Sequence, residues 1–158
     1  MEMDTRKMPE QVYALCKPSI DELLDRYAKR KHYHIVVMDP QKKPWECPFD
    51  EAILAEFSQG MERWEHDYKK IARSKAEQAW REQCANVVTQ TLAPATMRPG
   101  DTVFYGSFVY YGMVVACSGI EAYFDMLISS WYALAYQQLA QHYLTKHKAA
   151  YPDEVFLP

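Results

Sequence analysis

Apolar residues occur along this chain in two patterns, short uninterrupted runs and longer stretches with a spacing of three or four. The runs are residues 34–38 (HIVVM) and 113–117 (MVVAC). Their period alone does not separate a buried strand from a buried helix, but their length and β-branched content favour strands. We therefore predict two strands at the centre of a sheet, covered on both faces.

A β-hairpin is predicted immediately before the second run. Residues 103–105 and 108–111 are β-branched and aromatic, as is typical of strands. Gly106 lies between them and Gly112 follows them, and glycine adopts positive φ or allows a close backbone approach at little cost.

Three stretches have the spacing of amphipathic helices. The first is predicted to begin at Ser19 as the N-cap, with Glu22 completing a capping box. The second covers residues 49–83 and is predicted to break at Gly60 into a short and a longer helix. The third covers residues 120–147 and is long for a chain of this size.

The connecting segments carry turn and loop signals. Residues 39–44 contain Asp, Pro and Lys and predict a turn, after which 45–47 is interpreted as a short returning strand. Residues 86–100 lack a clear period and are predicted to form a loop with at most one helical turn. The last eight residues are predicted to be a tail whose apolar members, 155–157, dock on the core.

The predicted strands and helices indicate an α/β (α+β) protein, and length and composition fit one globular domain. Its 158 residues suffice for one domain, and 49% hydrophobic with 25% charged residues is typical of a folded chain. We expect an N-terminal extension over 1–17, a core over 18–147 and a tail over 148–158.

Charge and hydropathy exclude several function classes. A formal net charge of −3 gives no basic surface for nucleic acid. No segment reaches the roughly 18 apolar residues of a membrane span, and the polar N-terminus lacks the apolar core of a signal peptide. The expected protein is soluble and cytoplasmic.

The four cysteines do not form a metal-ligand or disulfide pattern. Cys16, Cys47, Cys84 and Cys117 are widely and singly spaced, which favours free thiols in a reducing compartment. No metal site is predicted. Cys117 lies at a predicted strand-to-helix junction, which is also where the nucleophile of a nucleophile-elbow motif lies. That motif requires glycine two residues before the nucleophile, and this chain has Val115 there.

Other residues near this junction are candidates for a ligand site. Ser118 is predicted to cap the long helix, with Glu121 completing a capping box, and such a helix start can also hold an anion. Lys75 and Asp125 form either a buried pair that orients two helices, which we favour, or part of a ligand site.

One histidine and several tyrosines are candidates for binding a flat ligand. His34, at the start of a buried strand, is either a structural histidine or an axial ligand of haem, which needs only one. Tyr105 and Tyr111 either line a pocket or pack on the hairpin.

The order of three short blocks resembles the haem-degrading or GlcG/HbpS-like domain family, which includes the C-terminal domain of PduO-type adenosyltransferases. The blocks are residues 36–39 (VVMD), 71–76 (IARSKA) and 115–119 (VACSG) followed by Asp125. They are similar to the family's V-V-D strand end, its helical A-x-x-K-A, and its G-V-S-G with a nearby Asp. The chain departs from the family at residues 105–108, where Tyr-Gly-Ser-Phe replaces Gly-Gly-x-Pro.

This resemblance implies a profilin-like antiparallel sheet flanked by helices, with a long C-terminal helix, in a protein that is often oligomeric. It also implies a ligand site near the glycine-containing hairpin, with haem or a related tetrapyrrole as the ligand. The expected ligand-binding residues are His34, Lys75, Tyr105, Gly106, Tyr111, Ser118, Gly119 and Asp125.

Three functions follow in order of preference. The first is binding of a small ligand without catalysis. The second is a homo-oligomeric interaction or scaffold protein whose long aromatic helix forms the interface. The third is an enzyme with Cys117 as its nucleophile.

Overall fold

The two apolar runs form the central strands of a sheet, as predicted. In the computed structural model, which describes residues 4–158, β1 (Tyr33–Met38) and β4 (Met113–Ser118) pair antiparallel, with Val36 opposite Ala116. Every residue of both strands is buried. A strand with apolar residues on both sides needs cover on both faces of its sheet, and helices supply that cover here.

The strand order is β2-β1-β4-β3, so β2 (Ile53–Gln59) and β3 (Ser107–Tyr110) are the edge strands. The prediction of a helix around Ile53, Leu54 and Phe57 is wrong, because this segment pairs with β1 along its length. The short strand predicted at 45–47 is also wrong, and a turn occupies that place. The spacing of apolar residues in β2 matches one helix turn equally well, and only the pairing with β1 selects the strand.

The predicted hairpin paired residues 103–105 with 108–111, whereas the observed hairpin pairs β3 with the following strand, β4. Residues 103–105 are not a strand, and the hairpin joins β3 to β4 through Tyr111 and Gly112. Both turn residues have positive φ, 46° and 77°, as the two-residue turns that match the twist of a β-hairpin require.

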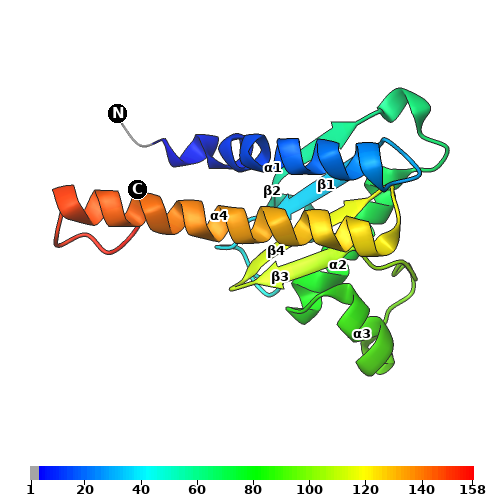
Figure 1. Ribbon diagram of the computed structural model, residues 1–158. Helices are drawn as coiled ribbons and strands as arrows, with labels where there is room; N and C mark the ends of the chain where they lie inside the picture. The colour runs from blue at the N-terminus through cyan, green and yellow to red at the C-terminus, as the bar shows by residue number, and fades with distance from the viewer. Residues whose placement is uncertain (1–3) are drawn as a thin grey trace.

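Helices cover both faces of the sheet (Figure 1). On one face α1 (Met8–Arg26) and α4 (Ala122–Ala150) run side by side in opposite directions and pack on the alternate residues that include Ile35, Val115 and Cys117. On the other face α2 (Tyr68–Glu82) packs its alanines and Trp80 on Val36 and Ala116. The predicted class, an antiparallel sheet flanked by helices with a long C-terminal helix, is confirmed.

The first helix begins eleven residues before the predicted N-cap at Ser19. Pro9 lies in the first turn, where its missing N–H leaves no hydrogen bond unmade, and Pro18 lies inside the helix. The expected boundary between residues 17 and 18 therefore falls within α1. Val12 and Cys16 are buried in the core, so the described part of the expected extension belongs to it, whereas residues 1–3 lie outside the described residues.

Helix α4 starts at Ala122, and Glu121 rather than Ser118 occupies the N-cap position, without a capping hydrogen bond from its side chain. Ser118 is the last residue of β4. The helix continues to Ala150, and the tail that follows leaves Val155 and Phe156 72% and 60% exposed instead of docking them on the core.

The remaining elements are short. Helix α3 (Asn86–Leu92) replaces much of the predicted loop and packs near β3. Single 3₁₀ turns occur at Thr5–Lys7, Phe49–Ala52, Met61–Arg63 and Pro94–Thr96. Across residues 4–158, none of the helices has the length and apolarity needed to cross a membrane.

The position of α1 generates a test of the corrected N-terminal boundary. Replacing Val12, which is fully buried, by Ala removes two methyl groups from the core, and we expect a loss of about 2 kcal/mol in the free energy of unfolding. Leu15→Ala on the exposed side of the same helix is the control, with an expected change within about 0.5 kcal/mol. Urea denaturation measures both, and equal losses would show that residues 8–17 do not pack as described.

Candidate functional site

A buried ion pair lies where the two helix layers approach each other at the end of β4. Lys75 of α2 and Asp125 of α4 place Nζ and Oδ2 3.1 Å apart, and their side chains are 1% and 2% exposed. Lys75 Nζ also donates to the backbone oxygen of Cys117, at 2.9 Å, and Asp125 Oδ1 accepts from the N–H of Ile120, at 3.3 Å. The pair that the sequence predicts therefore exists and is tied to the backbone on both sides of Gly119.

Gly106 lies against this pair. A Cβ at this position would come within 2.8 Å of both Lys75 Nζ and the Asp125 Cβ, so no side chain fits without displacing the pair. The carbonyl oxygen of Gly106 accepts from Ser129 Oγ at 2.6 Å and from the N–H of Cys117 at 3.2 Å. The glycine thus allows β3 to start directly beside the buried charges.

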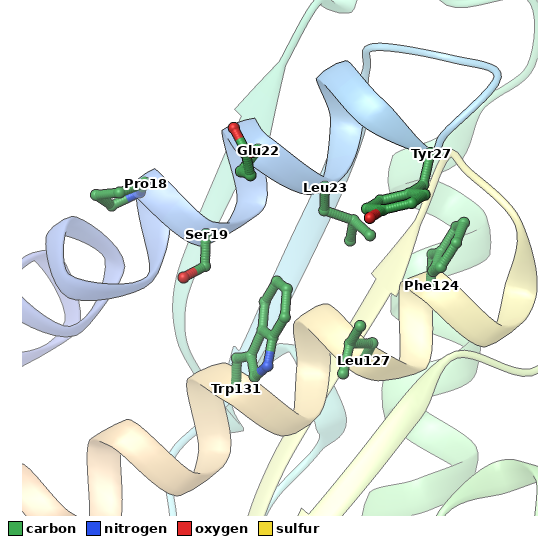
Figure 2. A pocket seen from close by; sticks show the side chains of 8 residues that line it. All are labelled: Pro18, Ser19, Glu22, Leu23, Tyr27, Phe124, Leu127 and Trp131. Carbon is green, nitrogen blue, oxygen red and sulfur yellow. The ribbon is translucent and has the colours of Figure 1, made fainter.

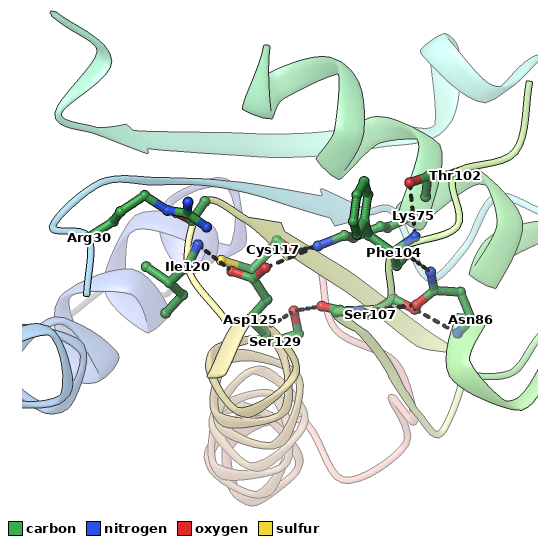
Figure 3. A network of polar contacts seen from close by, with 12 residues as sticks. Arg30, Lys75, Asn86, Thr102, Phe104, Ser107, Cys117, Ile120, Asp125 and Ser129 are labelled. Atoms are coloured by element: carbon green, nitrogen blue, oxygen red, sulfur yellow. Dashed lines mark hydrogen bonds and ion pairs between the residues drawn. The ribbon is translucent and has the colours of Figure 1, made fainter. Parts of the chain in front are cut away.

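Asn86 at the start of α3 holds the segment before β3 in place (Figure 3). Its Oδ1 accepts from the N–H groups of Gly106 and Ser107 and from Ser107 Oγ, at 3.2, 3.2 and 2.6 Å. Its Nδ2 donates to the carbonyl oxygen of Phe104 at 2.8 Å. These bonds fix the backbone that carries the Phe104 ring toward Lys75.

Above the ion pair lies a cavity of about 440 Å³, which we call the α2–α4 cavity. Its volume falls in the range of pockets for small organic ligands. Ile71, Phe104 and Ile120 give it apolar walls. Its charged and polar lining residues are Arg30, His66, Tyr68, Lys75, Ser118, Glu121 and Asp125.

Two buried polar atoms that belong to lining residues of the α2–α4 cavity have no hydrogen-bond partner among residues 4–158. They are the hydroxyl oxygen of Tyr68, a residue that is 4% exposed, and Oε2 of Glu121. The other oxygen of Glu121 accepts from the N–H of Lys29 at 3.2 Å. Buried polar atoms are nearly always satisfied in folded proteins, so both atoms suggest a partner that residues 4–158 do not supply.

Burial determines the protonation chemistry beneath the cavity. Desolvation raises the pKa of Asp125 to about 6, although the neighbouring charge of Lys75 acts in the opposite direction. Desolvation also raises the pKa of the Cys117 thiol well above its ordinary value, and Cys117 is fully buried. A thiol that is protonated and out of contact with solvent does not act as a nucleophile, so the structure gives no support to the cysteine enzyme.

The structure brings together four of the eight predicted ligand residues. Lys75, Ser118, Gly119 and Asp125 line the α2–α4 cavity, and Gly106 lies beside its buried pair. His34, Tyr105 and Tyr111 are not among the lining residues. Tyr111 is 82% exposed at the tip of the β3–β4 hairpin.

His34 is a structural histidine. Its Nδ1 bonds to Ser58 Oγ at 2.5 Å and its Nε2 to Glu56 Oε1 at 3.0 Å, so both ring nitrogens are occupied. Desolvation lowers the pKa of His34. Glu56 also pairs with Arg73, at 2.7 Å, and hydrogen bonding to that arginine lowers the carboxyl pKa to about 2.

The residues predicted for a haem do not fit it. An axial ligand needs a free ring nitrogen, which His34 lacks, and Tyr111 lies apart from Lys75 and Asp125 at the hairpin tip. Within residues 4–158 no three His, Cys, Asp or Glu side chains are grouped to hold a metal ion.

Sequence reasoning missed the residues that complete the cavity. Tyr68 and Ile71 share a helix face with Lys75, and that spacing of three and four residues was a usable signal. Arg30 and Glu121 lie in loops that precede β1 and α4, and they line one cavity because β1 and β4 are neighbours in the sheet. No periodicity in the sequence marks them.

A second concave surface is a groove between α1 and α4 of about 670 Å³, which we call the α1–α4 groove (Figure 2). Leu23 and Tyr27 of α1 face Leu127 and Trp131 of α4 across it, with Phe124 at one end. The groove is mainly apolar and lies on the outer side of the helix layer, away from the ion pair.

Comparison with known proteins shows a likeness of fold. No family model matches the chain, and no curated protein matches its sequence. The crystal structure of Klebsiella pneumoniae protein ORFY, described with the family model DUF336, superposes with a TM-score of 0.56 at 14% identity, over 87% of this chain and 94% of that one. DUF336 is the GlcG-like family, so the chain shares the fold of a GlcG-like protein.

The raised pKa of Asp125 generates a prediction about stability and pH. Between its ordinary value of 3.8 and about 6 the folded protein binds more protons than the unfolded chain, so Asp125 makes the free energy of unfolding fall as the pH rises. A shift of about two units corresponds to about 3 kcal/mol. We expect the difference in unfolding free energy between the natural protein and Asp125→Asn to fall by about that amount from pH 4 to pH 7.

Urea denaturation across this pH range measures the difference. Asp153→Asn changes an exposed carboxyl in the tail and is the matched control. A difference for Asp125→Asn that stays constant with pH would contradict the buried, titrating carboxyl.

Proposed function

We propose that this protein is a ligand-binding domain that holds a small organic molecule in the α2–α4 cavity. The observation that carries the proposal is the pair of unpartnered buried atoms, the Tyr68 hydroxyl and Glu121 Oε2, on residues that line one cavity. Leaving such an atom unsatisfied costs about 1–3 kcal/mol. A ligand that supplies both partners recovers that cost on binding.

The cavity also limits what the ligand can be. Glu121 Oε2, as a carboxylate oxygen, requires a hydrogen-bond donor, whereas the Tyr68 hydroxyl can donate or accept. Ile71, Phe104 and Ile120 favour an apolar body next to these polar groups. We propose binding without a step at Cys117, because this thiol is fully buried and burial raises its pKa.

The shared fold and the order of the three sequence blocks support a further proposal, that the chain is a distant GlcG-like protein. A tetrapyrrole is not our proposed ligand, because His34 has no free ring nitrogen. Haemin therefore serves as a comparison compound in the test.

Tyr68→Phe separates a binding role from a structural one. The hydroxyl has no hydrogen-bond partner in the described part of the chain, so its removal leaves the unfolding free energy of the ligand-free protein unchanged or raises it by about 1 kcal/mol. The same change weakens ligand binding two- to tenfold, as loss of one hydrogen bond does.

The binding measurement uses calorimetry with five compounds: benzoate, benzamidine, benzyl alcohol, L-phenylalanine and haemin. Tyr151→Phe, at an exposed tyrosine outside the cavity, is the matched control. Saturable binding of at least one non-tetrapyrrole compound that Tyr68→Phe weakens and Tyr151→Phe leaves intact supports the proposal. Binding that Tyr68→Phe does not weaken would refute the proposal. Binding of haemin alone, seen by calorimetry and as a shift of its Soret absorbance band, would also refute it.

The α1–α4 groove and the exposed tail favour self-association as a second function. Trp131, the groove residue of α4 nearest to the tail, precedes Tyr151, the C-cap of this helix, by 20 residues, about 30 Å at 1.5 Å per residue. The seven residues after Tyr151 reach at most about 25 Å, so Phe156 cannot enter the groove of its own chain. We propose that the tail of a second copy occupies it, with Phe156 against the apolar residues of the groove.

Sedimentation equilibrium over a concentration series tests this second function. We expect a concentration-dependent dimer that Phe156→Asp shifts at least tenfold toward monomer, because a charge replaces the apolar side chain that would enter the groove. Val103→Asp, at another exposed apolar residue, should leave the equilibrium unchanged. A monomer mass at every concentration would exclude the tail-in-groove dimer.

A further inference from the structure

The charged residues of the α2–α4 cavity leave one cation and one anion without a partner. Lys75 and Asp125 compensate each other at 3.1 Å in its floor. Of the other charged lining residues, neither Arg30 nor Glu121 forms an ion pair within residues 4–158. A ligand with a single charge would satisfy only one of these two residues, whereas a zwitterion satisfies both.

Glu121 is placed to receive a cationic group. It occupies the N-cap position of α4, and the N–H of Lys29 holds its Oε1 while Oε2 stays buried and unpartnered. A carboxylate oxygen only accepts hydrogen bonds, so its missing partner is a donor. An ammonium group supplies that donor together with the opposite charge, and such charge-assisted bonds are stronger than neutral ones.

Arg30 is placed to receive a carboxylate. Its Nε donates to the carbonyl oxygen of Gly119 at 2.7 Å, and its guanidinium carbon lies 5.8 Å from the centre of the Tyr68 ring. These two contacts fix the plane of the guanidinium group. Arg30 is an exposed residue, so its terminal nitrogens, which meet no acceptor among residues 4–158, contact solvent and are open to a carboxylate.

The two partners lie close enough for one compact head group. Arg30 is bonded to Gly119, and Glu121 is bonded to Lys29, so two hydrogen bonds cross-link the loop before β1 and the loop before α4. Figure 3 shows Arg30 next to Ile120, between these two loops. An α-amino acid carries its ammonium and carboxylate on one carbon, which matches two binding residues so placed.

The rest of the cavity accepts an apolar side chain. Ile71, Phe104 and Ile120 form walls beyond the head-group residues, and the Tyr68 hydroxyl is one further polar group. A volume of about 440 Å³ accommodates a single small molecule.

We infer that the ligand of the α2–α4 cavity is a free α-amino acid with an apolar side chain, its ammonium on Glu121 and its carboxylate on Arg30. This inference rests on the proposed ligand-binding function and specifies the chemistry of that site. Nothing in it requires a reaction at the bound molecule.

Three matched compounds test the two charges separately. L-Phenylalanine carries both, 3-phenylpropionate lacks the ammonium, and phenethylamine lacks the carboxylate. Calorimetry at pH 7 should show L-phenylalanine binding at least tenfold more tightly than either analogue. This preference is expected only if Glu121 binds the ammonium group and Arg30 binds the carboxylate.

Single variants assign each preference to its residue. Glu121→Gln should remove the preference over 3-phenylpropionate, and Arg30→Gln the preference over phenethylamine, each while keeping the other preference. Arg26→Gln, on an exposed arginine of α1 outside the cavity lining, is the control and should keep both. Circular dichroism melting curves of all variants confirm folding, and Arg30→Lys provides a second variant if Arg30→Gln does not fold.

The outcomes separate this inference from the function on which it depends. Equal affinities for the three compounds would overturn the amino-acid ligand. Binding only of other molecules in the five-compound panel would do the same. Either result would still support the proposed ligand-binding function of the cavity. Absence of binding by every compound in both sets would overturn both. Preferences that Glu121→Gln and Arg30→Gln remove one at a time support both.

Discussion

The ion pair between Lys75 and Asp125 is the constraint on which the rest of this structure depends. It joins helices on opposite faces of the sheet at the end of the central strand β4. Removing one partner of such a pair leaves a buried charge uncompensated, which typically costs 3–5 kcal/mol. The surrounding backbone is arranged accordingly, with Cys117 accepting from Lys75 and Ile120 donating to Asp125.

The α2–α4 cavity follows from this pair. Because the two charges satisfy each other in the floor, the lining residues above them are free to face a ligand. The loops that carry Arg30 and Glu121 are held by reciprocal hydrogen bonds, yet each keeps an unused charged group. Such a prearranged set of partners lowers the entropy lost on binding. The fold is shared with a GlcG-like protein, but the identity of the ligand depends on these individual side chains.

Several features of the fold were predictable because they depend on local pattern. The runs at 34–38 and 113–117 are apolar on both faces apart from His34, and the long helix has apolar residues at helical spacing. The errors lie where local pattern is ambiguous. Ile53, Leu54 and Phe57 fit a helix face as well as a strand, and α1 continues through Pro18 because its first turns are buried against α4 and the sheet.

The sequence by itself indicated the two central strands and the presence of helices beside them, and it favoured a buried pair of Lys75 with Asp125 over a place for both in a ligand site. Each of these depends on hydrophobic period or on the cost of burying a lone charge. Only the tertiary structure decided that β2 is a strand, that His34 is bound by Glu56 and Ser58, and that Arg30 and Glu121 line the same cavity. These depend on which strands become neighbours, and residues that strand pairing brings together from distant loops share no local pattern in the chain.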